Sequence, residues 1–220
     1  MLRHRLAVAT ALLLALTACG GGSDDNADDP IPGVDEETTA PSEETSDPEA
    51  DPEPDPDATE IPLPDDVELI FDWETPDDPT EAAALEGAAD YLRSIAASIV
   101  AQDPERGVYL GYAASDGARG YAREQIQAWV DNGWTMHGTD RYFDAEVAPA
   151  ESGGMRAQFC GDSTGMIGKD VETGEPLSAD QQIEESIYRY DVALVGAPGV
   201  EDFWQVNGIE VTDGAASCGG

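Results

Sequence analysis

The chain has 220 residues, of which 47 are acidic and 10 are Lys or Arg, so its formal net charge at pH 7 is −37. This length leaves room for one ordinary domain and additional segments. A surface this acidic repels the phosphates of nucleic acids, which bind to basic patches. The composition therefore argues against nucleic acid as a partner.

The first 18 residues have the pattern of a bacterial export signal. Arg3 and Arg5 are followed by an apolar run from Leu6 to Leu16, and small residues come before Cys19. A basic start, a short apolar stretch and small residues at the cut define a secretory signal. The run is shorter than the ~20 apolar residues that a membrane-spanning helix needs. The alternative is an ordinary secretion signal in which the cysteine is incidental.

The motif Leu16-Thr17-Ala18-Cys19 resembles the lipobox of bacterial lipoproteins. The resemblance implies that Cys19 carries a diacylglycerol and becomes the mature N-terminus. The protein would then be anchored by lipid at the outer face of the cell membrane.

Residues 19–77 are predicted to form a disordered, acidic, Pro-rich tether. The stretch from Cys19 to Thr80 holds 23 acidic residues and no Lys or Arg. Few apolar side chains and strong self-repulsion cannot offset the entropy cost of ordering the chain. Near its end, residues 67–73 are apolar enough to dock on the domain, and the sequence leaves open whether they do.

The globular domain is predicted over residues 78–220, beginning with three helices. Asp78-Pro79-Thr80-Glu81 is typical of a helix start, and apolar residues recur at helical spacing up to Ile99. A short second helix is expected over 105–114. A third is expected over 116–130, ended by Gly133.

From Trp134 onward the pattern predicts strands. Alternating apolar residues indicate strands over 139–147, 155–160, 183–195 and 203–211, with a Gly-rich loop over 161–178. The expected fold class is α+β, with three N-terminal helices packed on a curved antiparallel sheet of about four strands.

If Cys19 is lipidated, Cys160 and Cys218 remain as a pair in an exported, oxidising compartment. Disulfides persist there, which favours a bond between them. Two free thiols or a metal site are the alternatives, and the lack of nearby His spacing argues against zinc. No cofactor or metal site is predicted.

The order of elements resembles the cone-shaped fold of nuclear transport factor 2 and ketosteroid isomerase, which several actinobacterial lipoproteins share. The residues behind the resemblance include Tyr91, the Gly133-Trp134 step, the 159–163 segment, the 202–206 strand and Cys218. The resemblance implies a cavity between sheet and helices. Four aromatic residues are expected to line it: Trp134, Tyr142, Tyr188 and Trp204.

Enzymes of that fold use acids with Tyr or His in the cavity, with carboxyl pKa values raised by burial. The candidates are His137, Asp144, Tyr142, Tyr188 and Tyr190, but no local motif gives any of them a catalytic role, and none is assigned one. Solvent exposure explains Asp144 more simply, a near-surface position explains His137, and sheet packing explains the tyrosines.

Two main classes of function remain, beside a structural option in which the domain only regulates or decorates neighbouring envelope proteins. The first is a non-catalytic module that binds a small apolar ligand or an envelope protein, and the second is an isomerase- or cyclase-like enzyme using the same cavity. A raised-pKa carboxylate beside a tyrosine would favour the enzyme, and a filled or purely apolar cavity would favour the binding module. The sequence favours the binding module.

Overall fold

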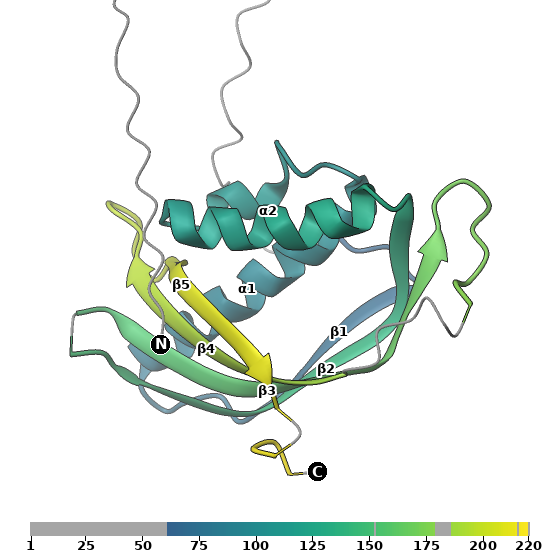
Figure 1. Cartoon of the computed structure of the whole chain (residues 1–220). Coiled ribbons are helices and arrows are strands. Elements are labelled where there is room, and N and C mark those ends of the chain that lie inside the picture. The colour runs from purple at the N-terminus through teal and green to yellow at the C-terminus, as the bar shows by residue number, and fades with distance from the viewer. Residues whose placement is uncertain (1–60, 152, 179–185, 215, 220) are drawn as a thin grey trace, which may run out of the picture. The chain divides into compact units, whose positions relative to one another are not determined.

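The computed structural model describes residues 61–151, 153–178, 186–214 and 216–219. These form two layers, a curved five-stranded sheet and two α-helices over one of its faces (Figure 1). The strands are β1 (Val67–Asp72), β2 (Trp134–Pro149), β3 (Met155–Asp170), β4 (Ile187–Gly196) and β5 (Trp204–Asp213). The helices are α1 (Pro79–Ala101) and α2 (Asp116–Val130), with the 3-10 helix η1 (Val108–Gly111) between them. No helix in these ranges is long and apolar enough to cross a membrane.

The predicted fold class is wrong in its helices and in its sheet. Among the described residues there are two α-helices instead of three, and they follow a strand instead of preceding the sheet. The sheet has five strands in the order β1-β2-β3-β4-β5, and it is mixed because β1 runs parallel to β2 while the other neighbours are antiparallel. The sequence predicts about four antiparallel strands, and β1 is not among them. This strand lies in the apolar segment 67–73, for which the sequence left open whether it docks on the domain.

Helix α1 begins as its sequence predicts. The Asp78 carboxylate accepts hydrogen bonds from the backbone N–H groups of Thr80 (2.8 Å) and Glu81 (3.1 Å). Pro79 occupies the first turn, where a missing N–H costs nothing. The helix ends at Gln102, whose left-handed backbone (φ 56°) turns the chain away.

The predicted helix over 105–114 is reduced to the single turn of η1. Asp103 caps the backbone N–H groups of Glu105 (3.1 Å) and Arg106 (2.8 Å), which fixes a turn there. Further on, the residues on either side of Ala113 bond to Val206 of β5, so this backbone extends along the sheet and is not coiled. The backbone groups of this segment are therefore hydrogen-bonded to β5 and are not available for the bonds that would continue a helix.

Strand β3 runs ten residues further than predicted, through the expected Gly-rich loop. Its extension pairs with the first half of β2, from Asp162 opposite Arg141 to Asp170 opposite Trp134. Gly161 fits within this strand because the space a side chain would occupy is filled by two rings. A Cβ atom there would lie 2.8 Å from the ring of Tyr190 and 3.2 Å from that of Tyr142. Glycine here permits close packing and does not end the strand.

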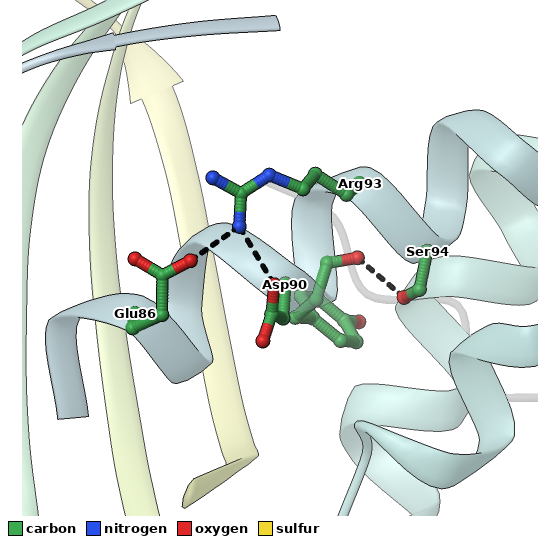
Figure 2. A network of polar contacts seen from close by, with 5 residues as sticks. Glu86, Asp90, Arg93 and Ser94 are labelled. Atoms are coloured by element: carbon green, nitrogen blue, oxygen red, sulfur yellow. Dashed lines mark hydrogen bonds and ion pairs between the residues drawn. The ribbon is translucent and has the colours of Figure 1, made fainter. Parts of the chain in front are cut away.

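Strand β1 is held to the rest of the fold through its inner face, whereas Glu68, Ile70 and Asp72 on its outer face are exposed. Towards the core, the Phe71 ring stacks on Tyr142 with centroids 5.0 Å apart. Phe71 also lies 4.4 Å from the guanidinium carbon of Arg93 on α1. Figure 2 shows that the same guanidinium is shared by Glu86 and Asp90, each 2.6 Å away. The charges on α1 thus orient the cation that packs on β1.

Cys160 and Cys218 form a disulfide, with Cα atoms 5.7 Å apart. Neighbouring side chains of a strand point to opposite faces, and Phe159 is buried beneath the helices. Cys160 therefore points to the other face of the sheet, where the C-terminal turn lies in Figure 1.

Candidate ligand-binding cavity

A cavity of about 900 Å³ lies between the inner face of the sheet and the two helices. Helix α1 gives it an aliphatic wall of Leu92, Ile95 and Ile99. Its aromatic lining consists of Tyr121, Trp129, Trp134, Tyr142, Tyr188 and Tyr190. The volume and the mostly apolar lining are those of a small-molecule site.

The sheet side of the cavity rests on a rigid aromatic cluster. The rings of Phe159 and Tyr190 are stacked with centroids 5.0 Å apart, and Tyr142 meets Tyr190 edge to face at 5.8 Å. Packed rings of this kind add about 0.5–1.5 kcal/mol per pair beyond the area that they bury. The cluster fixes the positions of the tyrosines that face the cavity.

Asp140 of β2 is the one acidic residue in the described lining of the cavity. Its Oδ2 accepts a long hydrogen bond (3.4 Å) from the Tyr142 hydroxyl. Its Oδ1 is buried and has no hydrogen-bond partner among the described residues. Such an orphaned acceptor is unusual inside a protein and marks a group available for another partner.

Burial raises the pKa of Asp140 from its ordinary value of 3.8 to about 6. Repulsion from the Asp162 carboxylate acts in the same direction, whereas hydrogen bonds from the side chains of Ser163 and Tyr142 oppose the rise. The group therefore changes charge close to neutral pH, which is typical of residues at functional sites.

Three tyrosines of the cavity, Tyr121, Tyr142 and Tyr190, remain protonated. Burial raises the pKa of Tyr121 to about 12 and raises the pKa values of Tyr142 and Tyr190 well above the ordinary value. The hydroxyl groups of these three tyrosines therefore act as neutral hydrogen-bond partners, whereas Asp140 titrates at about pH 6.

Three of the four aromatic residues predicted to line a cavity lie in its wall: Trp134, Tyr142 and Tyr188. Trp204 does not line it. Its backbone packs against α1 instead, where a Cβ atom added to Gly87 would lie 2.6 Å from the Trp204 carbonyl oxygen.

Of the residues considered for catalysis, Tyr142, Tyr188 and Tyr190 lie in the cavity wall. Asp144 is exposed and has a left-handed backbone (φ 52°) in an irregularity of β2. His137 is not part of the described lining, although its Nε2 is buried and has no described partner. Within the described residues, no three His, Cys, Asp or Glu side chains gather as metal ligands would.

The residue that sequence reasoning missed is Asp140. It precedes Tyr142 by two positions, and residues two apart on a strand share a face. Because Tyr142 was expected to line the cavity, the same spacing could have indicated that Asp140 lines it too.

Cys19, predicted to be lipidated, lies outside the described residues, as do the predicted signal segment and most of the predicted tether. The chain matches no protein-family model, no curated protein and no solved structure in the comparisons made.

Proposed function

We propose that this protein is an exported lipoprotein, anchored through Cys19, whose folded domain binds a small apolar molecule without chemically changing it. The observation that carries the binding proposal is the cavity of about 900 Å³ with its aliphatic and aromatic walls. Transfer of apolar surface from water into such a site contributes about 25 cal/mol per Å² buried. A ligand with a few rings or a short alkyl chain would gain several kcal/mol from this term alone.

The anchoring proposal rests on the sequence Leu16-Thr17-Ala18-Cys19 and its basic, apolar leader. The Cys160–Cys218 disulfide supports an extracytoplasmic location, because disulfides persist in oxidising compartments. Membrane fractionation of cells expressing the full chain tests it. Cys19→Ser should move the protein from the membrane fraction to the medium, and retention at the membrane would contradict the lipid anchor.

The resemblance to nuclear transport factor 2 and ketosteroid isomerase stays a prediction from short sequence motifs. The binding proposal does not depend on it, because the cavity and its lining support the proposal directly.

Ligand binding can be measured with N-phenyl-1-naphthylamine, a neutral probe that becomes fluorescent in apolar sites. Ala128 lies in the cavity wall but is exposed, so Ala128→Phe should fill part of the cavity without overpacking the core. Gly120→Phe is the matched control, because it adds the same ring on α2 where no heavy atom lies within 4 Å.

The expected result is saturable fluorescence enhancement with the wild type and the Gly120 variant, and at least ~10-fold weaker binding with the Ala128 variant. If the Ala128 variant binds the probe as tightly as the wild type, the probe does not occupy this cavity. Absence of saturable binding to the wild type would also oppose the proposal.

The second candidate function is that of an isomerase- or cyclase-like enzyme. The observation that favours it is the buried Asp140 carboxyl beside the Tyr142 hydroxyl, since a carboxylate with a raised pKa is suited to moving protons. In deuterated water such a carboxylate would take a proton from the carbon beside a carbonyl group and allow a deuteron to replace it. NMR of 2-tetralone with wild type and Asp140→Asn tests this, and only an exchange rate that the variant loses would favour the enzyme.

A further inference from the structure

The polar groups of the cavity are unbalanced in charge. Its described lining contains one carboxyl group, that of Asp140, and no Arg, Lys or His side chain. The remaining polar lining consists of uncharged groups such as Gln125, Asn132 and Ser163. The cavity therefore presents a negative charge without a protein cation to neutralise it.

The surroundings of Asp140 do not compensate for this missing cation. The hydrogen bonds to the carboxylate are few: the Tyr142 hydroxyl donates to Oδ2 over 3.4 Å, Ser163 provides a second donor, and Oδ1 has no described partner. An isolated anion removed from water is costly unless a cation or several donors approach it. A positively charged ligand group would remove that cost, whereas an anionic ligand would add to it.

The aromatic lining favours the same kind of ligand. Six aromatic residues line the cavity, including Trp129 and Trp134, which face it from α2 and β2. The negatively polarised faces of such rings attract ammonium groups. The excess of acidic residues over the whole chain also raises the local concentration of cations.

We propose that the ligand of this cavity is a lipophilic organic cation, an amine or quaternary ammonium whose charge lies against Asp140 and whose apolar part packs on α1. The proposal rests on the binding function proposed above and specifies its ligand class. A carboxylate without a cationic partner in the described lining, aromatic rings and an aliphatic wall in one cavity are the three groups such a molecule needs.

Three probes of nearly equal shape separate the effect of charge from that of apolar contact. 1-Naphthylmethylamine is a cation at about pH 8, 1-naphthylmethanol is neutral and 1-naphthoic acid is an anion. Their dissociation constants can be measured by titration calorimetry in about 0.15 M salt, which screens the exposed surface charges. The proteins are the wild type, Asp140→Asn and the control Glu210→Gln, which removes an exposed carboxylate of β5 that does not line the cavity.

With the wild type and the Glu210 variant, the amine should bind at least ~10-fold more tightly than the alcohol, and the acid should bind most weakly. In Asp140→Asn the amine should lose this preference while the alcohol keeps its affinity. Retained alcohol binding shows that the variant is folded with its cavity intact.

Other results would overturn the proposal in distinguishable ways. Equal binding of amine and alcohol to the wild type, or tightest binding of the acid, would refute the cationic ligand and leave the apolar binding site standing. A preference for the amine that survives in Asp140→Asn would place the cation elsewhere. If none of the three probes binds, the binding function itself fails.

Discussion

Replacing Asp140 with Asn should stabilise the protein at and above neutral pH. The two side chains have nearly the same shape, so the substitution removes the charge and leaves the packing in place. In the folded protein the carboxyl keeps its proton up to about pH 6, compared with 3.8 as its ordinary value. Since the folded state binds this proton more tightly, the group lowers the free energy of unfolding as pH rises from 3.8 towards 6.

The size of the effect follows from the shift. A rise of about 2 pH units corresponds to about 3 kcal/mol at 1.36 kcal/mol per unit. Part of the side chain is exposed, and water there reduces the penalty, so we expect about 2 kcal/mol. Below the ordinary pKa both residues are neutral, and the difference between wild type and variant should disappear.

Urea denaturation of both proteins at about pH 4 and about pH 8 measures this difference directly. Subtracting the variant from the wild type at each pH cancels the titration of acids that do not interact with Asp140, such as Asp191, whose pKa is lowered by its hydrogen bond with Arg156. Glu210→Gln should follow the wild type. A stability difference between wild type and Asp140→Asn that is the same at both pH values would refute the argument that the buried charge is costly.

Two further predictions concern bonds between parts of the chain that are distant in the sequence. Reduction of the Cys160–Cys218 disulfide, which joins residues 58 positions apart, should cost about 4 kcal/mol of unfolding free energy. A reductant should lower the wild-type melting temperature and leave a Cys160→Ser/Cys218→Ser double variant unaffected, and an unchanged wild-type melt would contradict the bond. Tyr91→Phe removes a buried 2.6 Å hydrogen bond from the Tyr91 hydroxyl to the Ala118 carbonyl, which joins α1 to α2. This should cost about 1–2 kcal/mol in urea denaturation, and a loss below measurement error would show that the helices do not depend on it.

The parts of the fold that could be predicted depend on neighbours in the sequence. Helix α1 begins at its predicted residue because Asp78 and Pro79 cap it locally. Helix α2 ends before Gly133, whose positive φ (69°) provides the turn that its position suggests. The strands β4 and β5 were likewise expected from their alternating apolar residues.

The parts that could not be predicted depend on distant partners. Strand β1 is six residues long and becomes a strand by pairing with β2, about 70 residues later. Strand β3 continues past Gly161 because the rings of Tyr142 and Tyr190 pack against this glycine, and that contact cannot be read from the sequence around it. Local pattern alone does not report these contacts.

The candidate site was predictable in composition but not in its key residue. The family resemblance placed Tyr142 in the cavity wall, where it lies, whereas the alternation on β2 put it on the same face as the exposed Asp144. The irregularity between Phe143 and Glu146 breaks that alternation. The buried acid is Asp140, whose raised pKa arises from desolvation by several elements at once. Desolvation is a property of the assembled fold, so the sequence identified the wall of the cavity without the group that gives it polarity.

The edge strand β1 has a mechanical consequence. It is the first element that the chain reaches after residue 66, and it contributes Leu69 to the cavity wall and Phe71 to the aromatic cluster. A pull on the preceding chain would therefore act on β1 before any other strand. Displacing β1 would remove Leu69 from the cavity wall, so tension on the chain would weaken ligand binding. A filled cavity would make the strand harder to peel away, which force spectroscopy with and without a bound probe could detect.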